Sequence, residues 1–517
     1  MKKIIIIGGG IAGLSAGIYA LKSGYEAEIY EKNPVPGGNC SGWKRGDYYI
    51  DNCIHWMSGT KTDTPQNKIW HDVGALGDHV SIIKREAFYS SELSGDVITL
   101  WRDTERTLKE MLALSPEDEK PIKQFIKYVQ ILEKIQTPME NTSDMINVFR
   151  DINTVVSGKE LIGGLVEYGR LSLETLAKKF RHPLLQKVFL DFMAKEYESY
   201  WLIIAYAIFT CDNGDIPSGG SMGIVNNMCE TFRKLGGKIY TNSEVECVRV
   251  NKKKFRINKE IFDEKSFNLY KVKRIVSQNA DGIRLKNGKE IDGDYIICAC
   301  DINYTFDSLL KRKYAPKQIR KLFSSKKNHR IYSSYQVAFS VEGIMEEIND
   351  TLSFDCEPID VGKHCFDRIT VKNYRIYGDY IAPEGHTVIQ CSIVQYKEDY
   401  AYWNRLHKNI DRYNLEKRNI AQAVCYRIEQ KFPKYSGKIH ILDSWTPVTY
   451  ATRNNNYCGA YMRYITTIAT QKAFLPCDIK RLGNVFLASH WLRYPGGIPT
   501  AATMGKVAIE RIDKLAK

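Results

Sequence analysis

A glycine-rich segment close to the N-terminus has the spacing of a phosphate-binding turn. Residues 8–13 read Gly-Gly-Gly-Ile-Ala-Gly, which fits the pattern G-x-G-x-x-G. In such a turn Gly8 permits the tight bend, Gly10 lets the backbone approach a pyrophosphate, and Gly13 lets the following helix pack closely on a sheet. The N-terminus of that helix then offers free N–H groups and the positive end of its dipole to the phosphates. The chemistry that this segment predicts is dinucleotide binding.

The elements that must position this turn lie on both sides of it. Ile4–Ile7 is apolar and β-branched, as a buried parallel strand would be, and a segment with one apolar face follows the turn until Gly24. Residues 27–31 predict a second strand that ends at Glu31, 18 residues after Gly13. An acid about 20 residues after the last glycine can accept hydrogen bonds from a ribose diol. The strand, the helix, the second strand and the acid therefore follow one another in the order and at the spacing of a dinucleotide-binding unit.

Five segments form an ordered set along nearly the whole chain. They are residues 5–38, which end in Pro36-Gly37-Gly38 and are followed by Asn39; residues 47–56, which end in Ile54-His55-Trp56; residues 216–245, with Pro217-Ser218-Gly219-Gly220 and Glu244-Val245; residues 295–301; and residues 486–506, with Ala488-Ser489-His490-Trp491 and Pro495-Gly496-Gly497-Ile498. This set resembles the phytoene desaturase, carotenoid isomerase and retinol saturase group of FAD-dependent oxidoreductases.

The resemblance implies one bound FAD. In that group a glycine pair after the acid lets the chain run along the flavin dinucleotide, a valine meets the adenine, and a C-terminal glycine-rich turn meets the flavin. Carried onto this sequence, the cofactor-binding residues are Gly8, Gly10, Ile11, Ala12, Gly13, Glu31, Lys32, Gly37, Gly38, Asn39, Val245, Ala488, Ser489, Gly496, Gly497 and Ile498.

The resemblance also implies the fold. We expect an α/β protein in which a Rossmann-like FAD-binding domain, of the glutathione-reductase and amine-oxidase type, is interleaved with an α+β substrate domain. The FAD-binding pieces are expected at 1–75, 213–310 and 440–517. The substrate-domain pieces are expected at 76–212 and 311–439.

The implied reaction adds or removes hydrogen at carbon–carbon bonds of a hydrophobic, polyene-like or lipid substrate, with an external electron donor or acceptor. The flavin carries the redox step, while protein groups position the substrate and tune the ring. His55 and His490 are the polar residues expected nearest the ring, and histidine titrates in the range needed to move a proton. The alternative is that each is a structural histidine. Tyr450 and Tyr457 are weaker candidates, and the ten histidines are too dispersed to predict a metal site.

Three other functions are compatible with the same segments. A redox-neutral isomerase would use reduced flavin without net electron turnover, and an amine oxidase would use the same architecture. A non-catalytic binding protein, similar to the Rab escort and GDP-dissociation inhibitor proteins, would share the fold without flavin catalysis. The complete set of Gly8, Gly10, Gly13, Glu31 and Gly496-Gly497 argues against the last of these.

The composition indicates which partners and which cellular compartment to expect. The 517 residues are 44% hydrophobic and 26% charged, which is ordinary globular usage, and the net charge is +14. A solvated basic surface is the simplest interpretation of this charge, and contact with an anionic membrane surface is the alternative. Without a nucleic-acid-binding motif we expect no nucleic-acid partner. The 13 cysteines are an odd number without a Cys-x-x-Cys pair, which predicts reduced thiols and a cytoplasmic protein. Association of this protein with a membrane is expected from its charge alone.

Four further segments carry local expectations. Residues 105–140 have helical periodicity, with a helix start near Ser115-Pro116. Residues 200–209 are too short to span a bilayer and predict either a core helix or the wall of a lipid-sized pocket. The turn at 218–223 lacks a preceding apolar strand and so does not predict a second nucleotide site. Residues 251–274 are rich in lysine and arginine and predict a surface hairpin.

Overall fold

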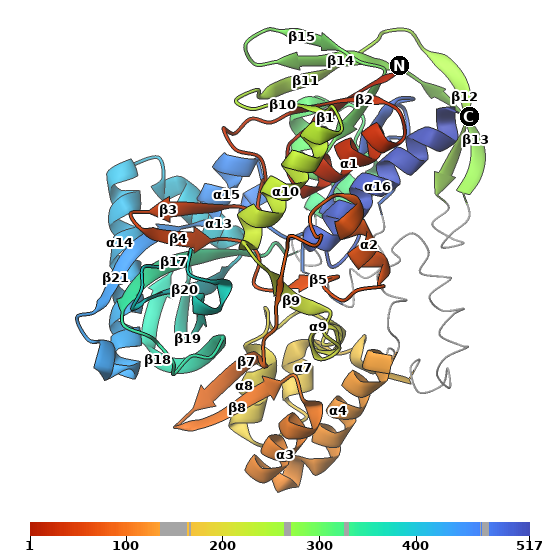
Figure 1. The fold of residues 1–517 in the computed structure, drawn as a ribbon. Coiled ribbons are helices and arrows are strands. Elements are labelled where there is room, and N and C mark those ends of the chain that lie inside the picture. The colour runs from red at the N-terminus through yellow and green to blue at the C-terminus, as the bar shows by residue number, and fades with distance from the viewer. Residues whose placement is uncertain are drawn as a thin grey trace.

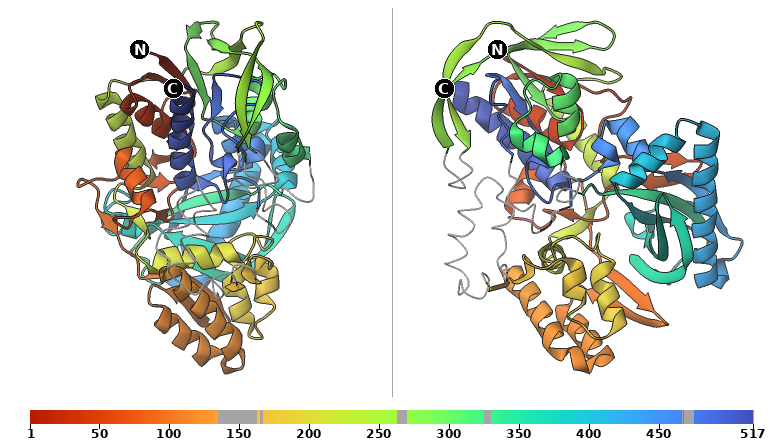
Figure 2. Two further views of the ribbon diagram at one scale, coloured as in Figure 1. Left: turned by 90° about the vertical axis from the view of Figure 1, so that its right-hand side faces the viewer. Right: turned by 180° about the vertical axis from the view of Figure 1, so that it is seen from behind.

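The computed structural model describes residues 1–134, 163–164, 167–262, 270–324, 330–465, 467 and 475–516. These residues form three regions that meet around a central cavity (Figures 1 and 2). One region holds a parallel sheet with helices, the second holds a large mixed sheet, and the third is helical. The α/β class expected from the sequence is confirmed.

The parallel sheet contains the predicted glycine-rich turn. Its strand order is β10-β2-β1-β16-β22, and every neighbouring pair is parallel. The isoleucines of β1 are buried between the two neighbouring strands, as their β-branched side chains favour. The five strands are β1 (Lys3–Ile7), β2 (Glu26–Tyr30), β10 (Lys238–Tyr240), β16 (Tyr295–Cys298) and β22 (Val485–Leu487).

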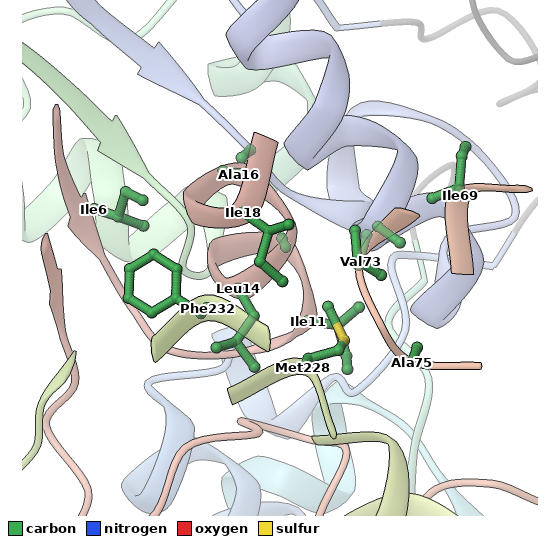
Figure 3. Close-up of a cluster of buried hydrophobic side chains, with 14 of the residues drawn as sticks. Ile6, Ile11, Leu14, Ala16, Ile18, Ile69, Val73, Ala75, Met228 and Phe232 are labelled. Atoms are coloured by element: carbon green, nitrogen blue, oxygen red, sulfur yellow. The ribbon is translucent and has the colours of Figure 1, made fainter. Parts of the chain in front are cut away.

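Helices from both ends of the chain cover this sheet. Helix α1 (Ile11–Lys22) packs against α10 (Gly220–Lys234) and α16 (Gly497–Ala516), while α2 (Pro65–Asp72) contacts α16. Figure 3 shows the cluster in which Leu14 and Ile18 of α1 lie near Phe232 of α10. Helix α1 has nine buried residues out of twelve, so it is a core helix rather than a surface helix with one apolar stripe.

The mixed sheet has seven strands in the order β21-β17-β20-β19-β18-β7-β8. Helices α13 (Lys397–Leu406) and α14 (Ile410–Lys431) pack on one of its faces, over an apolar core. Helix α15 (Pro447–Asn454) follows β21, which is the last strand of this sheet along the chain. The strands are β7 (Ala87–Leu93), β8 (Asp96–Trp101), β17 (Ser333–Glu342), β18 (Thr351–Val361), β19 (His364–Asn373), β20 (His386–Gln395) and β21 (Ile439–Trp445).

The helical region lies beside β7 and β8 (Figure 1). It confirms the helical periodicity predicted from residue 105 and the helix start after Ser115, while residues 135–140 of that segment lie outside the described residues. The segment 200–209 forms the buried helix α9. The described helices here are α3 (Thr104–Leu114), α4 (Glu119–Lys134), α7 (Leu173–Ala177), α8 (Pro183–Leu190) and α9 (Tyr200–Thr210).

Shorter strands and helices link the regions. Strand β12 pairs with β13 in antiparallel register, which confirms the predicted hairpin, although residues 263–269 are outside the described part. The linking elements are β3 (Gly42–Arg45), β4 (Tyr48–Asp51), β5 (Met57–Ser58), β6 (Ile82–Ile83), β9 (Gly214–Pro217), β11 (Val245–Val250), β12 (Phe255–Phe262), β13 (Tyr270–Ser277), β14 (Ala280–Leu285), β15 (Glu290–Asp292), α11 (Ile302–Tyr304) and α12 (Lys317–Ser324).

Two further expectations from the sequence concern the turn at 218–223 and the division into domains. The turn at 218–223 follows β9, a buried four-residue strand that contains Asp215, so a strand precedes the turn but it is not the apolar strand of a nucleotide fingerprint. Strand β9 pairs with β5 and β6 rather than with the parallel sheet. The expected domain division stays a prediction. Strand β21, which that division assigns mostly to the FAD-binding part, pairs with β17 of the mixed sheet.

Within the described ranges, no helix is long and apolar enough to cross a membrane.

The contact between α1 and α16 yields a test of the fold. A Cβ atom added at Gly505 would lie 2.7 Å from both the carbonyl oxygen of Ala12 and the amide nitrogen of Ala16. Because both neighbours are backbone atoms, the two helices would have to separate. We expect Gly505→Ala to lower the free energy of unfolding by about 1–3 kcal/mol, measured by urea unfolding followed by circular dichroism. The exposed substitution Glu510→Ala on the same helix should change it by less than about 0.5 kcal/mol; equal effects would contradict this packing.

Candidate active site

A cavity of about 1210 Å³ opens where the strands of the parallel sheet end. Its wall includes Ile7, Glu31, Ala299 and Ser489, which stand at the carboxyl ends of four neighbouring strands. Ligands of open α/β sheets bind at this edge, where the chain reverses direction between strands and helices. From there the cavity continues to the mixed sheet and to α9.

Glu31 is held rigidly at the end of β2. Its side chain is buried, and one carboxylate oxygen accepts a hydrogen bond from the backbone N–H of Gly9 at 2.7 Å. The other oxygen accepts from the backbone and side-chain nitrogens of Asn33, at 2.8 and 2.9 Å. These contacts fix the carboxylate beside the glycine-rich turn, where a ribose would meet it.

Two helix N-termini reach the same cavity. Helix α1 begins after Gly10 and helix α16 begins at Gly497, and the first residues of both helices line the wall. No side chain caps the N-terminus of α1. Free backbone N–H groups and the positive ends of two helix dipoles therefore face the cavity, a combination that binds phosphates and other electron-rich groups.

Glycines let the backbone segments that form this wall approach one another closely. An added Cβ would lie 3.0 Å from the carbonyl oxygen of Ala299 at Gly8, and 2.4 Å from that of Cys40 at Gly37. Both glycines also have positive φ angles, of 104° and 123°, which other residues rarely adopt. The backbones of Gly10 and Gly37 pair through an isolated bridge. Together with Glu31 and the helix N-termini, this narrow backbone cradle fits an extended dinucleotide.

The structure brings most of the predicted cofactor-binding residues together. All of them line the cavity except Gly13 and Ala488. Gly13 lies directly behind the turn, where an added Cβ would be 1.9 Å from the carbonyl oxygen of Gly8. Ala488 is fully buried in the core of the parallel sheet. These two residues support the wall from behind. That the other residues contact the cofactor stays a prediction.

A group of asparagines that the sequence analysis did not identify completes this part of the wall. The side-chain oxygen of Asn39 accepts hydrogen bonds from Asn454 and Asn456, at 2.7 and 2.8 Å. The ammonium of Lys32 donates to the carbonyl oxygen of Thr452 at 2.8 Å and to Asn455 at 3.0 Å. The only signal in the sequence was the run Asn454-Asn455-Asn456 itself, which matches no binding motif.

Both predicted catalytic histidines line the cavity, but they do not titrate as expected. Burial lowers the pKa of His55 to about 4, and the positive charges of Lys372 and Arg85 act in the same direction. Burial also lowers the pKa of His490 to about 4, with a further contribution from Arg463. The expectation that these side chains titrate near neutral pH is therefore wrong, because both imidazoles are neutral there. Within the described structure the Nδ1 atom of His490 is buried without a hydrogen-bond partner.

The two weaker tyrosine candidates differ. The hydroxyl of Tyr450 lines the cavity, donates to Asn52 at 2.9 Å and accepts from Gln336 at 3.0 Å. Tyr457 is not part of the cavity wall, and its hydroxyl accepts from Lys397 at 2.8 Å. Among the residues that the structure describes, no group of histidine, cysteine and acidic side chains could hold a metal ion.

Comparison with known proteins identifies the family. A model described as "Flavin containing amine oxidoreductase" matches residues 11–512. The chain belongs to the flavin-containing amine oxidoreductase family. Like other members, this flavin-containing amine oxidoreductase is an FAD-dependent oxidoreductase, and FAD is its cofactor.

Individual relatives are distant. A phytoene desaturase (neurosporene-forming) of Rhodobacter capsulatus is 23% identical over 332 residues, which cover 60% of this chain and 55% of that protein, so the match spans about half of its length. A 1-hydroxycarotenoid 3,4-desaturase of Flavobacterium is 22% identical over 99% of both chains. The cyclohexylamine oxidase of Brevibacterium oxydans has the same fold, with a TM-score of 0.59 at 13% identity over the whole of both chains.

The cradle of this flavin-containing amine oxidoreductase can be tested at Gly10. An added Cβ there would meet its nearest neighbour, the carbonyl oxygen of Gly37, at 3.7 Å. The fold should therefore tolerate a small addition, but a branched side chain would occupy the space of the pyrophosphate. We expect Gly10→Val to fold and to lose most of its FAD, measured by the visible flavin absorbance per protein. Gly10→Ala is the matched control, and full FAD content in folded Gly10→Val would contradict the assignment.

The lowered pKa of His55 predicts a pH dependence of stability. The unfolded chain binds a proton near pH 6.5, whereas the folded protein does so only near pH 4. The stability is therefore fully present above pH 6.5 and is lost as the pH falls towards 4. Compared with the wild type, His55→Gln should lose about 2 kcal/mol less unfolding free energy between pH 7 and pH 5.

The measurement is urea unfolding at the two pH values. Exposed His79→Gln provides the control, since its side chain faces solvent. Parallel pH profiles for the wild type and His55→Gln would show that His55 is not buried in its neutral form.

Proposed function

We propose that this protein transfers hydrogen at carbon–carbon bonds of a lipid-like or polyene-like substrate, as a desaturase or saturase. The observation that carries the proposal is the extent of the cavity, which continues without a break from the cofactor cradle to an aromatic wall. The names of the carotenoid desaturases among its relatives support the same substrate class.

The aromatic wall would bind the apolar part of such a substrate. It is built by β7, α9 and the segment before β5, and its members include Trp56, Phe88, Trp201, Ile204 and Ile208. Phe88 stacks with Phe209 at a ring-centre distance of 5.3 Å, which holds the wall in place. Large apolar side chains exclude water and gain free energy when a hydrocarbon chain covers them.

FAD, when bound, accepts or donates a hydride, and the protein has to handle the accompanying proton. His55 faces the cavity as a neutral imidazole, which can accept a proton at one nitrogen or donate a hydrogen bond at the other. His490 presents a second neutral imidazole next to the turn at Gly496, where an added Cβ would lie 3.2 Å from its Nδ1 atom. We propose His55 as the group that moves the proton and His490 as a hydrogen-bonding partner of the flavin.

Two features of the surroundings belong to this proposal. The net charge of +14 supports reversible contact with an anionic membrane, from which a lipid substrate could enter. Only one complete dinucleotide fingerprint is present in the sequence, and FAD occupies it in the proposal. The electron partner is then external, such as a quinone, oxygen or a small redox protein.

The proposal is tested by anaerobic mixing of the FAD-loaded protein with phytoene, with cyclohexylamine or with NADPH. We expect phytoene to bleach the flavin, or reduced enzyme to be reoxidised by a more unsaturated polyene. NADPH alone should reduce the flavin slowly, because no second nucleotide fingerprint is present. Rapid bleaching by the amine would favour an amine oxidase, and polyene isomerisation without net bleaching would favour an isomerase. Flavin that responds to none of these, nor to a long-chain unsaturated acid, would contradict the proposal.

A further inference from the structure

The cavity has two unlike walls. One wall is the aromatic and aliphatic surface from β7 and α9 described above. A second wall is formed by strands β17, β18, β19 and β20 of the mixed sheet, the same sheet in which β7 lies next to β18. A purely hydrocarbon substrate would be expected to lie between two apolar walls.

The sheet wall is polar because of the alternation of side chains along its strands. Val337, Leu352, Val371 and Cys391 point into the apolar core beneath α14. Their neighbours in sequence point to the other face and line the cavity. We call these neighbours the polar floor, which consists of Gln336, Ser353, Thr370, Lys372, Gln390 and Ser392.

Covering the polar floor with a hydrocarbon is unfavourable in free energy. Ser353 and Thr370 satisfy each other through a hydrogen bond of 2.8 Å between their hydroxyls. Gln390 is buried and donates to the carbonyl oxygen of Asp51 at 2.9 Å, but its own side-chain oxygen has no partner in the described structure. Removing water from such groups without replacing its hydrogen bonds is unfavourable. A ligand with its own polar group avoids that loss.

Positive charge gathers where Lys372 of this floor and Arg85, from the segment before β7, share one carboxylate. Lys372 and Arg85 are both buried, both line the cavity, and both pair with the buried carboxylate of Asp350. The Arg85–Asp350 distance is 2.6 Å. Asp350 itself is not part of the cavity wall, so its carboxylate stands behind the two cations. The negative charge of buried Asp51 also acts on Lys372, where it opposes the lowering of the pKa by burial. The neighbouring acid, Asp215, is paired with a different cation, Arg102, at 2.5 Å.

This cation pair adjoins His55. The positive charges of Lys372 and Arg85 both contribute to the lowered pKa of that histidine, and Asp350 opposes them. The ring of Tyr374 connects the two places, since it lies 6.4 Å from the His55 ring and 5.7 Å from the ammonium of Lys372. A group bound by the cations would therefore lie close to the proposed proton-handling residue.

We propose that the substrate is an amphipathic lipid whose carboxylate is bound by Lys372 together with Arg85 on the polar floor. Its apolar chain then lies along the aromatic wall, while hydroxyl and amide groups of the floor replace the water around the acid group. This inference rests on the proposed function, and it narrows the substrate class from hydrocarbons to acids. A carboxylate matches both cations because it offers two charged oxygens to their donors.

The first test compares ligands of one chain length on the FAD-loaded protein: oleate, its methyl ester, oleyl alcohol and octadecene. Binding is followed by the quenching of tryptophan fluorescence and by the change in the flavin spectrum. We expect oleate to bind about ten- to a hundred-fold more tightly than the ester or the alcohol, because a hydrogen bond to a charged group is worth that factor. Equal affinities for the four ligands would overturn the inference.

The second test removes one cation. In Lys372→Met the buried Arg85–Asp350 pair stays neutral, so we expect the variant to fold and to keep its FAD. Oleate should then bind about ten- to a hundred-fold more weakly, with little change for octadecene. Lys372→Arg should retain most of the preference for the acid. The matched control is Lys187→Met, which also removes a cavity-lining lysine but one that pairs with Asp355 and lies off the polar floor.

The outcomes separate the two proposals. If octadecene binds as tightly as oleate, or if Lys372→Met binds oleate as the wild type does, the carboxylate site is wrong and the proposed hydrogen transfer stands. If no ligand of the series binds to the FAD-loaded protein, the lipid-binding function itself is contradicted. Should Lys372→Met fail to retain FAD, the ligand series on the wild type and the Lys372→Arg variant still decides the question.

Discussion

The close approach of α1 to the end of β1 is the constraint on which the rest of the site depends. The position of a Cβ at Gly13 is already occupied by the carbonyl oxygen of Gly8, so the helix can start directly after the strand only with glycine there. The same helix accepts α16 from the far end of the chain, because Gly505 offers no side chain and the Ser15 hydroxyl donates to the carbonyl oxygen of Ala502 at 2.6 Å. Two helix N-termini thereby reach one cavity.

Burial then determines the chemistry that the cavity can support. Two histidines that would titrate near neutral pH in water are kept uncharged, because the charged form is poorly solvated in the protein interior. Burial raises the pKa of Asp301, which also lines the cavity, to about 6, although it accepts hydrogen bonds from three backbone N–H groups. His55 and His490 thus present neutral hydrogen-bonding groups to the cavity. Fixed positive charge stands where Lys372 and Arg85 meet Asp350.

Membership of the flavin-containing amine oxidoreductase family establishes the cofactor and the fold, but it does not define the substrate. A common fold supports many reactions, and selectivity comes from the side chains around the flavin. Here those side chains form an aromatic wall from β7 and α9 and a polar wall from β17 to β20. This combination is the basis of the proposal that the substrate is apolar along most of its length and carries one polar group.

The sequence by itself determined the N-terminal part of the cofactor cradle, because the features of that part are local. The strand Ile4–Ile7, the glycines at 8, 10 and 13, and Glu31 lie within 31 residues, and their spacing is fixed by the geometry of one strand–turn–helix–strand unit. The helix at 200–210 and the hairpin at 255–277 were predictable for the same reason. Only the tertiary structure decided the rest. The pairing of Arg85 with Asp350 joins residues 265 positions apart, and the polar floor exists only once four strands lie in one sheet. The pKa values of His55 and His490 likewise depend on burial and on charges brought from distant segments, which no spacing in the sequence reveals.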